Sequence, residues 1–237
     1  MKYLHTYEIF ESVIDPNYTF IKQELFKLKD DIFNYAKNYK QLLNILNRNK
    51  IFENNSIIFS DDVGHENSIY EGYGISSAAT IPETGVIYVI FDNTIMSVIK
   101  KMKSGELDYS VFIGYLENII AHELVHREQL VRMGQKGIDS LIKKIDNMHS
   151  IESEEESGKV YFNMPTELMA FAKQSMLELI MNGINKEKIL EDLKTNSGLA
   201  NLLNNSDSFL QLYYFYKKDS KQFHRFTKYL YEYVIEN

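Results

Sequence analysis

Helix-breaking residues are rare and unevenly placed in this chain, and they constrain its fold more than any other feature. The 237 residues include three prolines, Pro16, Pro82 and Pro165, and eleven glycines. Four of the glycines and one of the prolines fall within residues 51–92. Because proline and glycine interrupt regular structure, we expect long helices on both sides of this segment and short strands within it.

Apolar residues recur at three- and four-residue steps through most of the remaining chain, which is the spacing of one buried helix face. This spacing predicts one or two helices over residues 17–48, and further helices over residues 93–103, 108–133, 137–149, 165–182, 185–194, 206–217 and 220–235. Gly134 follows the 108–133 segment directly, at the position where a glycine commonly ends a helix.

Residues 51–92 contain short runs of β-branched and aromatic residues, which predict three or four strands. The run VIYVIF, residues 86–91, is apolar on both alternating faces, as is typical of a covered strand. We expect its edge to offer a pairing site for an extended peptide. The predicted fold class is therefore α+β and predominantly α, with a small antiparallel or mixed sheet packed on a long helix between N-terminal and C-terminal helices.

Composition argues against several functional classes. The formal charge of −7 and the absence of a long Lys/Arg run disfavour a nucleic-acid partner. The longest apolar run falls far short of the roughly 20 residues that span a membrane, and polar residues interrupt the N-terminus before any signal peptide can form. The sequence therefore predicts a soluble cytoplasmic protein with no membrane partner.

One stretch, NIIAHELVHREQL at residues 118–130, carries residues suited to catalysis. On a helix, His122 and His126 lie one turn apart on the same face, so both imidazoles can bind one ion. Glu123 can act as a general base beside that ion, which completes the H-E-x-x-H pattern of zinc peptidases. The expected cofactor is Zn²⁺. The alternative is a core helix whose two histidines are satisfied by hydrogen bonds.

A catalytic zinc ion needs a third protein ligand. The metzincin pattern is excluded because Gln129 and Arg132 occupy the positions where it requires glycine and histidine. Glu167 is the favoured candidate, since it lies in the first turn of the helix that Pro165 opens. The competing ligands are Asp146, His149 and the acidic residues 152–156.

The site also needs a group besides the ion to stabilise an oxyanion. Tyr161 and His149 are the candidates, because both lie in or near the segment that links the two ligand helices. For Tyr161 the alternative is an aromatic side chain that simply packs in a loop.

The segments AHELVHREQ, residues 121–129, and MPTELMAFA, residues 164–172, resemble the gluzincin class of HExxH metallopeptidases. They are similar in particular to small zincin-like proteins encoded by tailed phages. In these a second helix of the form P-x-E-x-x-A supplies a glutamate ligand, and Glu167 matches that position. The resemblance covers residues 86–182. It implies one zincin-like domain over residues 1–237, in which helical segments, 1–50 and 183–237, flank a metallopeptidase core, 51–182.

The function implied by this resemblance is zinc-dependent hydrolysis of peptide bonds, in which Glu123 takes the proton of a metal-activated water. The alternative is a non-catalytic structural or virion-associated phage protein that retains a zincin scaffold. The implied partners are a protein or peptide substrate, or other virion or phage proteins under the alternative. A phage-encoded chain would act in the host cytoplasm or in the virion.

Overall fold

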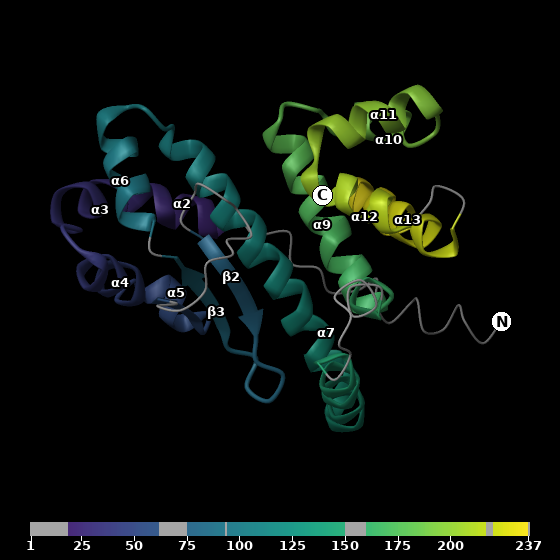
Figure 1. The fold of residues 1–237 in the computed structure, drawn as a ribbon, viewed down its shortest axis with the longest axis horizontal. Helices are drawn as coiled ribbons and strands as arrows, with labels where there is room; N and C mark the ends of the chain where they lie inside the picture. Colours follow the sequence, from purple (N-terminus) through teal and green to yellow (C-terminus); the bar gives the residue numbers. More distant parts are fainter. Residues whose placement is uncertain (1–18, 62–74, 93, 150–159, 217–219, 237) are drawn as a thin grey trace.

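The computed structural model describes residues 19–61, 75–92, 94–149, 160–216 and 220–236. A long helix, α7 (Tyr109–His149), runs through the middle of the molecule. The sheet and the N-terminal helices lie on one side of α7, and the C-terminal helices lie on the other (Figure 1). The predominantly helical fold with a small mixed sheet, predicted from the sequence, is therefore observed.

The sheet contains β1 (Ile57–Asp61), β2 (Ile75–Thr80) and β3 (Ile87–Phe91) in the order β1-β3-β2. Strand β3 is parallel to β1 and antiparallel to β2. Its residues are buried or half-buried on both faces, as the apolar run predicted. The expectation that this strand pairs with a peptide is wrong, because both of its edges are already paired. Strand β2 lies next to the motif helix, α7, and within the described residues one of its edges is unpaired.

Five helices lie on the same side of α7 as the sheet: α2 (Thr19–Lys27), α3 (Lys29–Tyr35), α4 (Tyr39–Asn47), α5 (Lys50–Asn54) and α6 (Ile95–Ser104). Of these, α4 and α5 pack against β1. The prediction of one or two helices over residues 17–48 missed the breaks that separate α2, α3 and α4. Asn38 and Asn49 cap α4 and α5 by accepting hydrogen bonds from backbone amides in the first turn. Helix α5 also falls inside the segment that was predicted to form strands.

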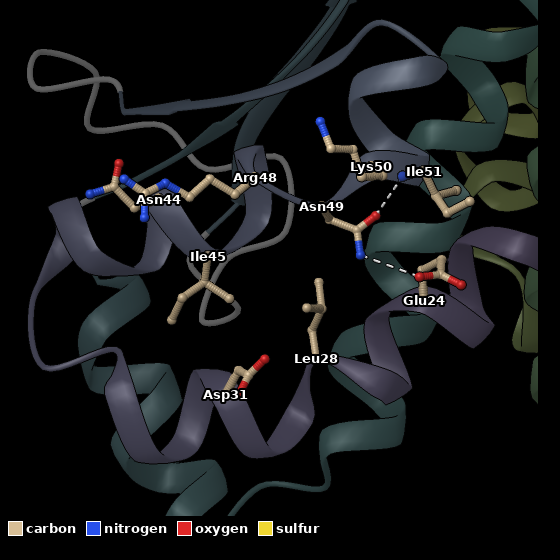
Figure 2. Close-up of a pocket in the computed structure, with 9 residues that line it drawn as sticks. All are labelled: Glu24, Leu28, Asp31, Asn44, Ile45, Arg48, Asn49, Lys50 and Ile51. Carbon is tan, nitrogen blue, oxygen red and sulfur yellow. Dashed lines mark hydrogen bonds between the residues drawn. The ribbon is translucent and has the colours of Figure 1, made fainter.

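The N-terminal helices enclose a hollow of about 530 Å³ between α2–α3 and α4–α5 (Figure 2). On its wall, Asn49 accepts a hydrogen bond from the backbone amide of Ile51 at 2.9 Å and donates one to Glu24 Oε2 at 3.2 Å. The bond to Glu24 connects the start of α5 to α2. No histidine lines this hollow, and it shares no lining residue with the H-E-x-x-H motif.

The C-terminal part contains α9 (Pro165–Met181), α10 (Lys186–Asp192), α11 (Asn196–Asn205), α12 (Asp207–Phe215) and α13 (Lys221–Glu236). Helix α9 packs against α7, α12 and α13. Helix α11 was not predicted. The two helices predicted over 108–133 and 137–149 form the two halves of α7, which kinks at Gly134, where φ is 63° and ψ is 175°.

Two buried apolar clusters meet where α7 packs on α9. One comprises residues between Ile21 and Leu124, the other comprises residues between Phe162 and Val234, and Leu177 packs against both. Within the described ranges, no helix is both long enough and apolar enough to cross a membrane. Several buried polar residues of α7 and α9, among them His122, Glu123 and Glu167, form the site described next.

Candidate metal centre

The two motif histidines and Glu167 come together in the interface between α7 and α9. His122 and His126 lie one turn apart, and their Nε2 atoms are 3.1 Å from each other. Glu167, in the first turn of α9, places its Oε2 atom 3.6 Å from Nε2 of His122 and 3.4 Å from Nε2 of His126. His122 and Glu167 are only 6% and 7% exposed. The structure thus brings together the three ligands that the sequence favoured.

This triangle has the size that a tetrahedral zinc site requires. Zinc bonds of about 2.0–2.1 Å place neighbouring ligand atoms about 3.3 Å apart. In addition, the buried Glu167 Oε2 has no hydrogen-bond partner within the described residues. Leaving a buried acceptor unsatisfied costs about 1–3 kcal/mol, and a cation between the three atoms would remove that cost. The donor set therefore fits a divalent metal ion.

The hydrogen bonds of two glutamines direct both Nε2 atoms into the triangle. Gln129 donates its amide hydrogen to the Thr166 carbonyl at 3.2 Å, so its Oε1 faces His126 Nδ1, also at 3.2 Å. Gln174 places its Oε1 3.1 Å from His122 Nδ1 in the same way. An amide oxygen can only accept a hydrogen bond. Each histidine therefore carries a proton on Nδ1 and presents Nε2 to the site.

Electrostatics at the site favour a positive charge. Burial alone would lower the pKa of His126, but the Glu167 carboxylate outweighs this effect and raises it to about 9. Burial would raise the pKa of Glu167, whereas the charges of His126 and His122 lower it well below its usual range. The negative charge of Glu167 and a positive charge beside it therefore stabilise each other in this buried site.

Glu123 lies beside the triangle but has a different partner. Its ligand atom and those of the two histidines all lie within 4.8 Å of one another. The Thr80 hydroxyl, on β2, is 2.8 Å from Glu123 Oε2 and 2.9 Å from the Glu123 carbonyl oxygen. Glu167 Oε2 thus lacks a donor, whereas Glu123 Oε2 has one from Thr80.

Two cavities of about 300 and 270 Å³ open at this site. Ala78 of β2, Glu123 and Tyr161 line both cavities. The walls of the first include Ile119, Phe162, Phe171, Asp207, Ser208 and Gln211, and those of the second include Pro82, Leu130, Met133, Leu141 and Met164. A bound peptide that extended from one cavity into the other would therefore pass beside Glu123.

Tyr161, one of the two candidates for stabilising an oxyanion, lines both cavities. Its hydroxyl hydrogen-bonds to Glu167, and burial together with the negative charge of Glu167 raises the pKa of Tyr161 well above its usual range. The other candidate, His149, is the last residue of α7, and its side chain lies outside the described residues. The same is true of the Asp146 side chain and of residues 152–156, so these competing ligands stay untested.

Sequence reasoning missed the residues that hold the site in place. Thr80, Gln129 and Gln174 were not proposed for any role, although each lies within hydrogen-bonding distance of a motif residue. A signal existed for Gln174, because it follows Glu167 by two helical turns and so lies on the same face of α9. No local pattern marks Thr80, which comes from a different segment of the chain.

No protein-family model, curated protein or solved structure matches the chain. The chemistry of the site is therefore inferred from its own residues and their geometry.

Proposed function

We propose that this protein is a zinc-dependent metallopeptidase in which His122, His126 and Glu167 hold the metal ion. The observation that carries the proposal is the buried triangle of Nε2, Nε2 and Oε2 atoms, with sides of 3.1, 3.4 and 3.6 Å, beside the carboxylate of Glu123. A site that only stabilised the fold would have no use for a second carboxylate facing two cavities. This arrangement favours catalysis over the structural alternative.

The chain supplies the proton transfers of peptide hydrolysis. When bound, zinc supplies Lewis acidity, which polarises a carbonyl oxygen and makes a water molecule more acidic. Glu123 takes a proton from the water as the water oxygen bonds to the carbonyl carbon. Glu123 then returns this proton to the amine nitrogen as the carbon–nitrogen bond breaks. The Thr80 hydroxyl orients the carboxylate of Glu123 during both transfers.

Tyr161 is suited to stabilise the negative charge that develops on the carbonyl oxygen. It lines both cavities, and a tyrosine hydroxyl keeps its proton at neutral pH. A hydrogen bond from a fixed donor to a developing oxyanion is among the largest contributions to such catalysis. We therefore propose that the Tyr161 hydroxyl turns from Glu167 to this oxygen when substrate binds.

Strand β2 provides a surface for the substrate backbone. Its residue Ala78 lines both cavities, and in the described part of the chain β3 pairs with only one of its edges. An extended peptide that added to the other edge would gain main-chain hydrogen bonds and place side chains in the cavities. The proposed substrate is therefore a protein or peptide segment in an extended conformation.

The first test measures metal content and hydrolysis in the same variants. We expect about one zinc ion per chain, as in catalytic sites with three protein ligands, and loss of zinc in His122→Ala, His126→Ala and Glu167→Ala. Glu123→Gln should keep the zinc and lose hydrolysis of a protein substrate by about 100-fold or more, because the base is removed. Glu128→Gln, on the same helix but lining neither cavity, is the control and should change neither quantity.

Two results would contradict the proposal. Absence of bound zinc in the wild-type protein would remove its basis. If zinc binds but Glu123→Gln hydrolyses substrate at the wild-type rate, the ion has only a structural role, as in the non-catalytic alternative.

A further inference from the structure

Behind His122 lies a third buried carboxylate, Glu178, which is only 5% exposed. It accepts four hydrogen bonds. Oε2 accepts from the Ser206 hydroxyl at 2.7 Å and from the backbone amide of Ser208 at 3.0 Å. Oε1 accepts from the Ser208 hydroxyl at 2.7 Å and from Gln174 Nε2 at 3.0 Å. Glu178 thus links His122, through Gln174, to the start of α12.

We propose that Glu178 is a positioning residue for the metal site: acting through Gln174, it fixes the proton of His122 on Nδ1 and so keeps Nε2 available to the ion. The proposal rests on the metal site described above. It assigns a role to the C-terminal helices, since Ser206 and Ser208 of the α11–α12 junction hold the Glu178 carboxylate in place.

The direction of each hydrogen bond follows from the carboxylate. An ionised carboxylate only accepts, so the amide nitrogen of Gln174 must face Glu178. The amide oxygen of Gln174 then faces His122 and accepts its Nδ1 proton. A different residue, Gln129, accepts the Nδ1 proton of His126. The backbone carbonyl of Thr166 orients Gln129 for this role.

Replacing the Glu178 carboxylate by an amide should reverse the orientation of the Gln174 amide between residue 178 and His122. In Glu178→Gln, the Oε2 position must remain an oxygen, because it faces the backbone amide of Ser208 and the hydroxyl of Ser206. The Ser206 hydroxyl oxygen already accepts a hydrogen bond from the Phe209 amide at 3.0 Å, so the hydroxyl donates its hydrogen to residue 178. The new amide nitrogen must occupy the Oε1 position, where it faces the amide nitrogen of Gln174.

Two facing donors cannot form a hydrogen bond, so Gln174 must turn over in this variant. Its amide nitrogen then faces His122 Nδ1, which favours the tautomer with the proton on Nε2. That tautomer has no lone pair to offer the ion. Glu178→Gln should therefore weaken zinc binding, although residue 178 contacts no proposed ligand and is connected to His122 only through Gln174.

Exchanging the two side chains should restore the original order. In the double variant Gln174→Glu with Glu178→Gln, the new carboxylate at position 174 accepts from His122 Nδ1 and from the new amide at position 178. The Ser208 hydroxyl turns to accept from that same amide, and the backbone amide of Ser208 keeps an oxygen as its partner. Each of the hydrogen bonds described above again has a donor and an acceptor, and His122 again carries its proton on Nδ1.

The experiment combines ¹⁵N NMR of the imidazoles in zinc-free protein with zinc affinity measured by competition with a chelator. We expect an Nδ1–H tautomer for His122 in the wild type and an Nε2–H tautomer in Glu178→Gln. The single variant should bind zinc about 10- to 100-fold more weakly, the usual effect of losing an outer-shell partner of a ligand. The double variant should regain both the tautomer and the affinity.

Two internal controls accompany these variants. Ser175→Ala removes a fully buried hydroxyl next to Gln174 on α9, one that has no hydrogen-bond partner in the described parts of the chain. This variant should change neither the tautomer nor the affinity. His126 should keep its Nδ1 proton in every variant, because its orientation does not depend on Glu178.

The proposal is overturned if wild-type His122 carries its proton on Nε2, if folded Glu178→Gln keeps the Nδ1–H tautomer, or if the double variant fails to restore it. Should Glu178→Gln not fold, the tautomers of the wild type and the double variant still decide the question. Failure of the proposed function would look different: the chain would bind no zinc, while the tautomer in zinc-free protein would still test the role of Glu178.

Discussion

At the scale of single residues, the most informative side chain away from the metal site is Lys173. It is 1% exposed, and its amine lies 5.4 Å from the ring centroid of Tyr233. Burial lowers the pKa of Lys173 from its usual 10.5 to about 8. Four charged residues act on it electrostatically: Glu128, Glu236, Lys186 and Glu117. The lowered pKa means that charging this amine destabilises the fold.

This pKa gives a prediction for stability against pH. Between about pH 8 and pH 10.5 the folded protein binds fewer protons at Lys173 than the unfolded chain does, so the free energy of unfolding rises with pH in this window. Below about pH 8 the whole cost of the charge is present. Relative to Lys173→Met, the wild type should gain about 1.6 kcal/mol between pH 8 and about pH 9.5.

Urea unfolding of both proteins at the two pH values measures this gain. The variant serves as the reference, because it keeps a long apolar side chain and cancels the pH dependence of all other groups. A constant difference between the two proteins across this range would contradict the lowered pKa.

The residue scale also shows what the sequence can and cannot reveal about a site. The spacing of His122, Glu123 and His126 requires only that their segment is helical, so the pattern located them. Thr80 lies 43 positions before Glu123 and contacts it only because β2 packs on α7. Such a contact depends on the tertiary fold, and no periodicity within one segment encodes it.

At the scale of elements, the kink in α7 rests on one glycine. Gly134 has φ of 63° and ψ of 175°, a combination that is open almost only to glycine. A Cβ atom added there would have no neighbour within 4 Å, so a substitution costs backbone strain and no steric overlap. We expect Gly134→Ala to lower the free energy of unfolding by about 1–3 kcal/mol.

Thermal or urea unfolding of this variant is the measurement. Lys136→Ala, at an exposed position two residues further on, is the control and should change stability by no more than about 0.5 kcal/mol. Equal stability of the wild type and Gly134→Ala would mean that the kink can relax without cost.

Element boundaries were predictable where the sequence carries a strong local signal. Pro165 opens α9, and Gly134 marks the end of the first half of α7, as predicted. The signals were weaker at the breaks that separate α2, α3 and α4, because no proline or glycine lies there. The order of the strands could not be predicted either, since the apolar pattern of β3 indicates a covered strand but does not identify its neighbours.

At the scale of the whole molecule, the proposed ion would join the two halves of the structure. Its ligands come from α7, which contributes to the first apolar cluster, and from α9, which contributes to the second. An ion that binds only the folded state stabilises it by about 2.7 kcal/mol when its concentration is 100 times the Kd. For a chain of this length we expect the Tm to rise by about 5–10 °C.

Calorimetry with zinc, and with an excess of chelator, checks this expectation. His122→Ala should melt at the same temperature in both conditions, because it lacks one of the three ligands. Glu123→Gln should respond to zinc as the wild type does. An identical Tm of the wild type with and without zinc would argue against a bridge between the two helices.

The mixed pairing of the sheet sets the order in which this half of the molecule can fold. Strands β2 and β3 are antiparallel neighbours joined by a short turn, in which the Ile81 amide donates to the Val86 carbonyl. Strand β1 pairs in parallel, with Ile57 beside Ile87, so it must return from a distant part of the chain. Local pairings form faster than distant ones. The hairpin that carries Thr80, and with it the strand that faces the cavities, is therefore expected to assemble before β1 joins it.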